Sequence, residues 1–181
     1  MPLIKPELWL LDMDGTLTHN GEGTGFYGQI IDGITDFLDA LDAKGIPWAV
    51  VTNSDTELAT WNLRMAGLDR WPHAILGDGF EGCAPKPAHD LLSRACSLLG
   101  YDTGSAIMVG DHFYDLKAAY KAGMPSILAQ WSGALPARNT GEWMPVMTAT
   151  HPSQLIELLD EGFPEPAWME MRRGDKDRDA G

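Results

Sequence analysis

Two aspartates near the start of the chain are spaced for joint chemistry. Asp12 and Asp14 lie two positions apart in the segment DMDGTL, residues 12–17, and in an extended chain both side chains point to the same side. Two carboxylates so close raise each other's proton affinity, so a cation or a proton is expected beside them. Gly15 permits a tight turn with a close approach of the backbone. Taken alone, an acidic turn in solvent explains the segment equally well.

Two further polar segments contain residue types that suit an anion. In TNS, residues 52–54, Thr52 can donate a hydroxyl hydrogen bond, and a helix that begins at Ser54 offers free backbone N–H groups. Asn53, between these two residues, is a further candidate ligand of the phosphate. Lys86 is the only Lys or Arg from residue 71 to residue 93, and the prolines on either side restrict its backbone. Helix capping and an exposed loop lysine are the simpler explanations of these segments.

A second acidic pair occurs in GDHFYD, residues 110–115. Asp111 and Asp115 are four positions apart, so at the start of a helix both can face a common point. Carboxylate oxygens suit Mg²⁺, a hard cation that proteins usually hold with a few carboxylates, water and substrate phosphate. Capping by Asp111 and a favourable helix dipole at Asp115 account for the pair as well. His112 is expected to be exposed at the start of this helix.

The apolar pattern predicts a parallel sheet that brings these segments together. Short apolar runs alternate with helical patterns, which is typical of an α/β fold with a parallel sheet flanked by helices. The expected strands span residues 8–12, 48–51, 74–76, 106–109, 126–129 and 146–148. In an open parallel sheet the carboxyl ends of the strands gather along one edge, where ligands bind. Separate turns and caps do not explain why all four polar segments occur in this order.

The helix after the second strand has the clearest predicted start. Ser54 and Glu57 form a capping box, which indicates that the helix begins at Ser54. The apolar residues that follow recur at helical spacing, so they are expected to face the core. These residues are Leu58, Trp61 and Met65.

Taken together, the motif residues resemble the haloacid dehalogenase superfamily of phosphohydrolases. Its four motifs appear in order as Asp12-Met13-Asp14-Gly15-Thr16, Thr52, Lys86 and Gly110-Asp111-x-x-x-Asp115. The sequence around Lys86 and Asp111 is most similar to the phosphoglycolate-phosphatase-like branch. The resemblance implies an α/β, Rossmann-like three-layer sandwich with a central, mainly parallel sheet.

The resemblance also implies a role for each motif residue. Asp12 would form an aspartyl-phosphate, and Asp14 would act as general acid and then as general base. Thr52 and Lys86 would bind the phosphoryl oxygens. Mg²⁺ would be held by the carboxylates of Asp12, Asp111 and Asp115 and by the backbone carbonyl of Asp14. Because a halide needs no protonation, Asp14 favours a phosphate ester over a haloacid as substrate.

The chain is expected to form one core domain, residues 1–163, without the large cap of that branch. Only a short Gly-rich flap, residues 18–29, fills the cap position, and its Phe26 and Tyr27 either touch the substrate or pack on the core. An open site of this kind suits a larger phosphorylated substrate, or a phosphorylated metabolite covered by a neighbouring subunit.

The last part of the chain has fewer motifs. Trp131 and Trp143 flank a Gly- and Pro-rich segment near the sheet edge and are further candidates for substrate contact. Residues 164–181 lack apolar periodicity and are expected to be a loosely attached tail.

The bulk composition excludes several classes of protein. A formal net charge of −13 and the lack of a long Lys/Arg run argue against binding to nucleic acid or to an anionic membrane. The first apolar run is interrupted by Asp12 and Asp14, so it cannot span a membrane. Cys83 and Cys96 lack metal-ligand spacing and are expected to be ordinary thiols. The expected location is the cytoplasm.

Three functions fit the motifs. The first is a Mg²⁺-dependent phosphatase, and the second is a phosphotransferase that passes the phosphoryl group to an acceptor other than water. The third is a binding protein that holds Mg²⁺ or a phosphorylated ligand without turnover. The general acid/base at Asp14 argues against the third, because a pure binding protein has no need of one. The order of the acidic residues and the lysine argues against a signalling receiver domain.

Overall fold

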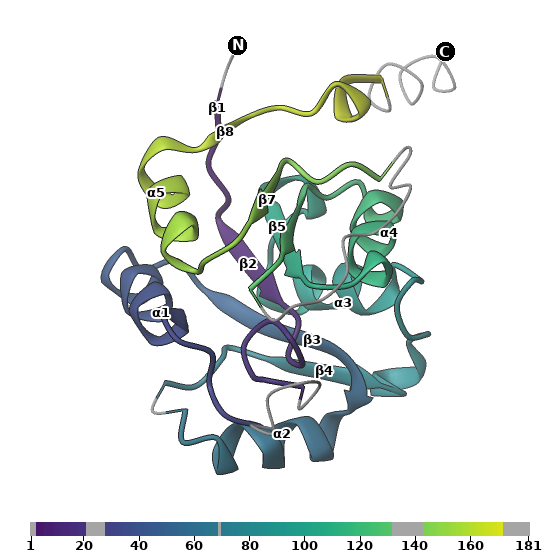
Figure 1. Cartoon of the computed structure of the whole chain (residues 1–181). Coiled ribbons are helices and arrows are strands. Elements are labelled where there is room, and N and C mark those ends of the chain that lie inside the picture. Colours follow the sequence, from purple (N-terminus) through teal and green to yellow (C-terminus); the bar gives the residue numbers. More distant parts are fainter. Residues whose placement is uncertain (1–2, 21–27, 69, 132–142, 172–181) are drawn as a thin grey trace.

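Six parallel strands form the centre of the protein, as the computed structural model shows (Figure 1). The structure describes residues 3–20, 28–68, 70–131 and 143–171. The strands are β2 (Leu8–Leu11), β3 (Trp48–Asp55), β4 (Ile75–Asp78), β5 (Ala106–Gly110), β6 (Ser126–Ala129) and β7 (Met147–Ala149). All six expected strands are present, and the predicted α/β fold with a parallel sheet is confirmed.

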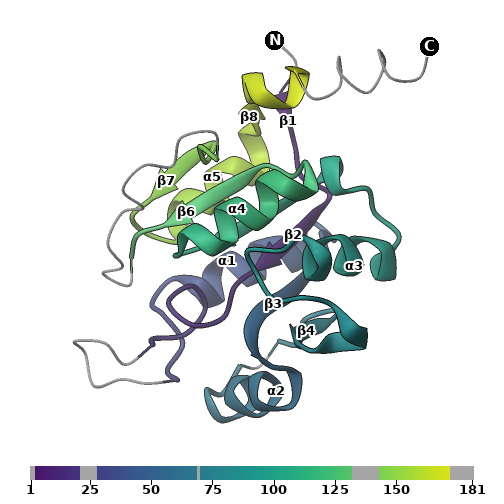
Figure 2. The same cartoon turned by 90° about the vertical axis from the view of Figure 1, so that its right-hand side faces the viewer.

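Helices cover both faces of this sheet, which gives three layers (Figure 2). The helices are α1 (Ile34–Ala43), α2 (Thr56–Met65), α3 (Asp90–Leu99), α4 (Phe113–Ala122) and α5 (Ser153–Glu161), with short 3₁₀ turns at η1 (Phe80–Gly82) and η2 (Thr103–Ser105). Buried side chains of α1, α2 and α5 pack on one face, and those of α3 and α4 pack on the other. None of the described helices is long and apolar enough to cross a membrane.

The strand order places the first strand of the sheet in the middle. The order is β4-β3-β2-β5-β6-β7. β3 and β4 therefore follow β2 on one side of the sheet, and the direction then reverses, with β5, β6 and β7 in sequence on its other side. This reversal opens a crevice at the carboxyl ends of the central strands, which is where open α/β sheets bind their ligands. The ends of β2, β3 and β5 are therefore neighbours, as the polar segments require.

Alternating side chains of β2 pack into two separate hydrophobic cores, one on each face of the sheet. Trp9 and Leu11 belong to the cluster on the side of α1 and α5, whereas Leu8 and Leu10 belong to the cluster on the side of α3 and α4. All four are at most 1% exposed, because a strand covered on both faces must be apolar throughout. The Trp9 ring packs edge-on against Phe37 of α1, with a centroid separation of 5.1 Å.

The predictions for α2 were wrong in two respects. The cap is Asp55, whose Oδ1 accepts the backbone N–H groups of Glu57 at 2.8 Å and Leu58 at 3.2 Å. Ser54 still belongs to β3, because that strand runs four residues further than expected. The apolar stripe predicted to be buried faces solvent instead. Leu58, Trp61 and Met65 are 50%, 61% and 67% exposed.

A different and narrower stripe attaches α2 to the sheet. Ala59 and Leu63 are its buried residues, and both are 0% exposed. Helical spacing alone cannot distinguish these two stripes, since both have residues three or four positions apart. Trp61, which the sequence assigned to the core, is therefore a surface residue.

Both ends of the predicted flap are paired with each other. The His19 N–H donates to Gln29 O and the Gly28 N–H donates to His19 O, each at 2.9 Å. Thr18 forms isolated bridges to Asp14 and Ile30. Phe26 and Tyr27 lie outside the described residues. The whole link from β2 to α1 spans residues 12–33.

The first part of the predicted tail contacts the domain. β8 (Phe163–Pro164) pairs antiparallel with β1 (Leu3–Ile4), and residues 167–171 are helical. Trp168 packs edge-on against Tyr120 of α4 at a centroid distance of 5.2 Å, and Met169 is 9% exposed. Residues 172–181 lie outside the described residues. Cys83 and Cys96 are free thiols.

The two stripes of α2 should differ in their contribution to stability. Leu63→Ala removes a fully buried side chain, so we expect the free energy of unfolding to fall by about 2–5 kcal/mol. Trp61→Ala on the same helix is the matched control and should change it by less than about 0.5 kcal/mol. Urea denaturation of both variants measures the difference. Equal losses would contradict the described orientation of α2.

Candidate active site

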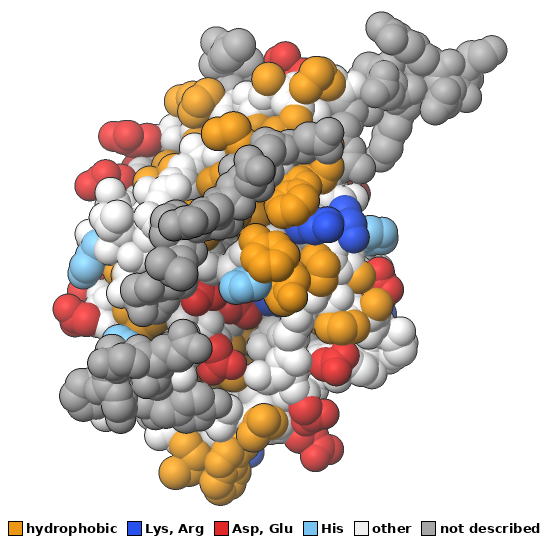
Figure 3. All heavy atoms as spheres, turned by 45° about the vertical axis from the view of Figure 1, so that its right-hand side comes forward, with side chains coloured by type: hydrophobic (Ala, Val, Ile, Leu, Met, Phe, Trp, Pro, Cys, Tyr) orange, Lys and Arg blue, Asp and Glu red, His pale blue; other side chains and the backbone are white. Residues whose placement is uncertain are grey.

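The four polar segments meet at the carboxyl ends of β2, β3 and β5. They surround a cavity of about 360 Å³. Its lining residues are Asp12, Asp14, Asn20, Thr52, Asn53, Ser54, Lys86, Asp111, His112, Tyr114 and Asp115. Acidic side chains gather at the centre of the face shown in Figure 3. All the residues that the sequence proposed for catalysis, phosphate binding or metal binding line this cavity.

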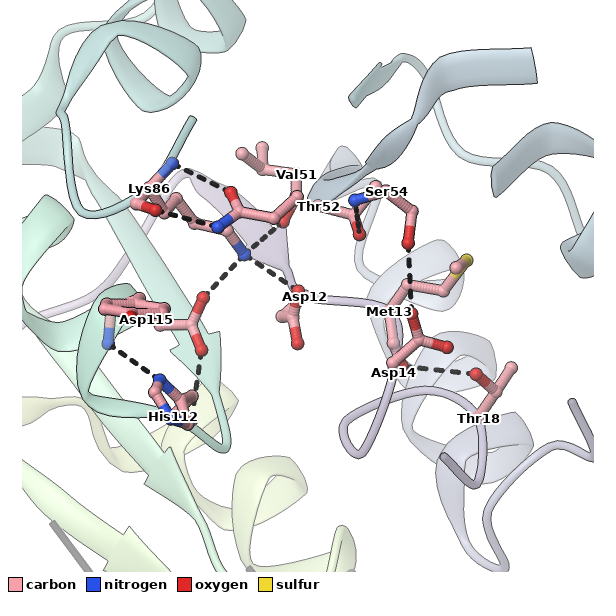
Figure 4. A network of polar contacts seen from close by, with 12 residues as sticks. Asp12, Met13, Asp14, Thr18, Val51, Thr52, Ser54, Lys86, His112 and Asp115 are labelled. Atoms are coloured by element: carbon pink, nitrogen blue, oxygen red, sulfur yellow. Dashed lines mark hydrogen bonds and ion pairs between the residues drawn. The ribbon is translucent and has the colours of Figure 1, made fainter. Parts of the chain in front are cut away.

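A buried lysine is the centre of the site (Figure 4). Lys86 is 3% exposed, and its Nζ donates to Asp12 Oδ1 at 2.8 Å, to Asp115 Oδ1 at 2.6 Å and to the Val51 carbonyl at 2.7 Å. An ammonium group has three protons to donate, and these three acceptors account for all of them. The three contacts come from β2, β3 and α4, so Lys86 connects three elements of the fold.

The charges of this cluster depend on one another. Burial lowers the pKa of Lys86, but the Asp115 and Asp12 carboxylates outweigh that effect and raise it above its ordinary value, so the side chain stays an ammonium. The pKa of Asp12 is raised to about 6. Burial is the largest cause, Lys86 acts in the opposite direction, and the Asp115 charge adds to the increase. The pKa of Asp14 is also raised, first by burial and then by the Asp12 charge.

The side chain of Asn53 holds the backbone of Lys86. Asn53 Oδ1 accepts the Lys86 N–H at 2.8 Å, and Asn53 Nδ2 donates to the Lys86 carbonyl at 2.7 Å. This pair of hydrogen bonds ties the loop that carries Lys86 to the end of β3. Asn53 was proposed as a phosphate ligand, and its side-chain amide is engaged in placing Lys86.

Asp115 is placed by the start of α4. Its Oδ2 accepts the His112 N–H at 3.1 Å, while the Tyr114 N–H donates to His112 Nδ1 at 3.3 Å, which makes a capping box of His112 and Asp115. Gly110 lets the carboxylate approach the backbone, because a Cβ at that position would lie 2.3 Å from Asp115 Cγ. The glycine of this motif is therefore required by the close approach of Asp115.

Three carboxylates fit a hard divalent cation. Asp12, Asp111 and Asp115 each offer an oxygen, and these oxygens lie within 4.8 Å of one another. Burial and the charges of Asp12 and Asp115 raise the pKa of Asp111 to about 7. Three ionised carboxylates at this position would therefore repel one another unless a cation lay between them. Oxygen ligands of this kind suit Mg²⁺. Each oxygen of Asp115 already accepts one hydrogen bond.

The second aspartate of the first motif faces β3. The Ser54 hydroxyl donates to Asp14 Oδ2 at 3.3 Å, and Figure 4 shows the two side chains pointing toward each other. The Ser54 N–H in turn donates to Thr52 Oγ1 at 3.1 Å. Sequence reasoning gave Ser54 only a capping role, because a contact between residues forty positions apart leaves no local signal.

The two candidate tryptophans have different positions. Trp131 Nε1 donates to the Thr16 carbonyl at 3.1 Å, so it ties the turn after Asp14 to the end of β6 and does not line the cavity. Trp143 stacks on Phe113 with a centroid distance of 6.5 Å. Tyr114 and Asn20 line the cavity and were not singled out from the sequence.

If a cation binds at these carboxylates, its effect on thermal stability should depend on pH. The unfolded chain loses its aspartate protons near pH 4, whereas folded Asp12 and Asp111 keep theirs until about 6 and about 7. Without a cation, the free energy of unfolding should therefore fall as pH rises through this interval. Mg²⁺ binds only the deprotonated carboxylates, so the increase in Tm on adding Mg²⁺ should be larger at about pH 8 than at about pH 5.

Asp111→Asn tests whether this effect belongs to the site. The variant removes one of the three carboxylates, so the Mg²⁺-dependent increase in Tm should shrink or vanish. Asp36→Asn on the exposed side of α1 is the matched control and should keep the increase. An increase that is independent of pH, or unchanged in Asp111→Asn, would contradict a cation site at these residues.

Comparison with known proteins supports a family assignment. Curated relatives include an N-acetylmuramic acid 6-phosphate phosphatase of Pseudomonas aeruginosa, 30% identical over 133 residues, which are 73% of this chain and 58% of the relative. A phosphoglycolate phosphatase of Cupriavidus necator is 33% identical over 119 residues, 65% of this chain and 51% of the relative. The chain thus spans only half to three fifths of the length of these two relatives.

Solved structures share the fold over nearly their full length. A HAD family hydrolase from Deinococcus radiodurans with bound phosphate and sodium aligns with a TM-score of 0.74 at 19% identity, covering 86% of this chain and 96% of that one. A predicted phosphatase from Clostridium acetobutylicum aligns with a TM-score of 0.73 at 20% identity, covering 88% and 100%. At these identities the likeness establishes the fold.

The family model described as haloacid dehalogenase-like hydrolase matches residues 25–123, which is more than half of the chain. This range contains Thr52, Lys86, Asp111 and Asp115, and the two remaining motif residues lie in the same cavity. The chain belongs to the haloacid dehalogenase-like hydrolases.

Proposed function

We propose that this protein is a Mg²⁺-dependent phosphatase that hydrolyses phosphate monoesters through an aspartyl-phosphate on Asp12. The observation that carries the proposal is the contact between the Lys86 ammonium and Asp12 Oδ1 at 2.8 Å, inside a cavity that Asp14 also lines. A carboxylate held by a buried cation, with a second carboxylate two residues away, has the parts needed for nucleophilic attack and proton transfer.

The reaction consists of two displacements at phosphorus. In the first, a carboxylate oxygen of Asp12 attacks, the bond from phosphorus to the ester oxygen breaks, and Asp14 gives its proton to the leaving oxygen. In the second, Asp14 takes a proton from water, whose oxygen attacks the aspartyl-phosphate and releases inorganic phosphate and free Asp12. The raised pKa of Asp14 supports this role, because the group must hold a proton before the first step.

The other residues bind and orient the phosphoryl group. Lys86 stays charged and is placed to balance negative charge on the phosphoryl oxygens, and Thr52, which is 2% exposed, offers its hydroxyl from the end of β3. Mg²⁺ would be held by Asp12, Asp111, the backbone carbonyl of Asp14 and, directly or through water, Asp115. It would offset the repulsion between an anionic nucleophile and an anionic substrate.

The relatives support a phosphorylated small metabolite as the substrate class. Two of them are named for N-acetylmuramic acid 6-phosphate and for phosphoglycolate. Both compounds are phosphate esters of small organic acids. Because the chain covers only part of each relative, the particular metabolite is left open in this proposal. The cytoplasm remains the predicted location.

Replacing the nucleophile tests the mechanism. Asp12→Asn should lower hydrolysis of an aryl phosphate in the presence of Mg²⁺ by about four orders of magnitude or more, because an amide oxygen cannot form the covalent intermediate. Chelation of Mg²⁺ should have a comparable effect on the unchanged protein, and Asp36→Asn should retain activity. Substantial turnover by Asp12→Asn would exclude the covalent route. Phosphoryl transfer to an added alcohol in place of water would favour the phosphotransferase.

Removing the Asn53 hydrogen bonds tests how Lys86 is placed. Asn53→Ala deletes both bonds to the Lys86 backbone, and two such bonds correspond to a loss of about tenfold to a hundredfold in kcat. The Mg²⁺-dependent increase in Tm should persist, because Asn53 offers no ligand to the cation. Asn62→Ala on α2 is the control for losing an asparagine. An unchanged kcat in Asn53→Ala would show that Lys86 needs no such support.

A further inference from the structure

Three consecutive aromatic rings lie at the start of α4, and two of them line the cavity. His112 caps α4, and Phe113 and Tyr114 are its first two residues. The centroid of the His112 ring lies 4.3 Å from that of Phe113 and 4.5 Å from that of Tyr114. His112 and Tyr114 line the same cavity as Asp12. Phe113 and Tyr114 are 36% and 40% exposed. Large aromatic side chains at a helix start are thus held at the rim of the site and are only partly covered.

The aromatic surface continues away from the cavity. Trp143 stacks on Phe113 at 6.5 Å with an interplanar angle of 27°, and Lys117 Nζ lies 4.9 Å from the centre of the Trp143 ring on its face. Figure 3 shows hydrophobic side chains beside a histidine and basic side chains, next to the acidic centre of this face. We call His112, Phe113, Tyr114 and Trp143 the aromatic shelf.

The cavity is small, so a larger substrate would extend past it to the aromatic shelf. At about 360 Å³ the cavity is near the lower limit for ligand pockets, which range from about 300 to 1,000 Å³. With the phosphoryl group against Asp12 and Lys86, the rest of a larger ester must pass the rim. Beside the cavity, the described residues His112, Phe113 and Tyr114 offer aromatic surface for such further contacts.

We propose that the aromatic shelf binds the leaving group of the substrate and that this group contains a ring with an apolar face. Aromatic side chains stack on other rings and on the C–H faces of sugars, and such contacts discriminate ring-bearing esters from short acyclic ones. The inference rests on the proposed phosphatase function and narrows its substrate class. It places Tyr114 beside the ring at the rim and Phe113 and Trp143 further out.

Three primary alkyl phosphates with similar leaving groups test this preference. They are phenethyl phosphate, a hexose phosphate esterified at its primary hydroxyl, and glycerol phosphate. We expect kcat/KM to be about threefold to tenfold higher for at least one ring-bearing ester than for glycerol phosphate, which is the discrimination that one aromatic pair supplies. The phenethyl and hexose esters separate an aryl ring from a sugar ring.

Variants of the shelf should change the ratio of these rates. Tyr114→Ala and Phe113→Ala are expected to lower the ring-to-acyclic ratio of kcat/KM toward one. Trp61→Ala removes an exposed aromatic residue from α2 and should leave the ratio as it is. A wild-type ratio near one, or an equal fall for all three esters in the shelf variants, would overturn the proposal while the phosphatase function stands.

Binding measurements separate the shelf from turnover. Calorimetric titration of Asp12→Asn with the same three esters and Mg²⁺ should give tighter binding of a ring-bearing ester, and adding Tyr114→Ala should remove the difference. If the unchanged protein hydrolyses none of the esters, the proposed function fails, yet this binding preference would still support the shelf. Equal binding of all three esters would overturn the shelf in that case as well.

Discussion

The burial of one ammonium group between two carboxylates is the interaction on which the site depends. Lys86 joins Asp12 at the end of β2 to Asp115 in the first turn of α4, and its third proton is bound by a carbonyl of β3. Removing one partner from a buried ion pair leaves an uncompensated charge and is strongly destabilising, by about 3–5 kcal/mol. Asp12, the proposed nucleophile, is thus held by a lysine that also connects three elements of the fold.

The sheet order makes that contact possible. β2 lies between β3 and β5, so the residues that follow these three strands converge without any long excursion of the chain. Asp115 reaches the centre because it lies one turn into α4 and because Gly110 leaves room for its carboxylate. Asn53 completes the arrangement by holding the Lys86 backbone with two hydrogen bonds. Polar groups at different strand ends therefore act as one unit.

The sequence predicted the sheet, and it predicted which polar segments meet at one edge of it, because both follow from local patterns. Continuous apolar runs identified the buried strands, and carboxylates after these runs identified the edge that binds ligands. The orientation of α2 was missed, since the stripe of Leu58 and Trp61 has the same period as the buried stripe of Leu63. The partners of Asn53 and Ser54 were missed for another reason. Their hydrogen bonds join positions far apart in the chain, and no local pattern encodes them.

The charge balance of the cavity links the cation to the substrate. Among the described residues that line it, four have carboxylates, namely Asp12, Asp14, Asp111 and Asp115, and one, Lys86, has an ammonium group. Burial first, and then the neighbouring carboxylates, raise the pKa values of Asp12 and Asp111. A phosphate dianion would be repelled by such a cavity, and lysine alone cannot reverse the sign. A divalent cation at the carboxylates brings the local charge close to balance, so cation and phosphate should bind cooperatively in the proposed reaction. In the proposed reaction, the acidic cluster that would hold Mg²⁺ would thus also disfavour phosphate binding in its absence.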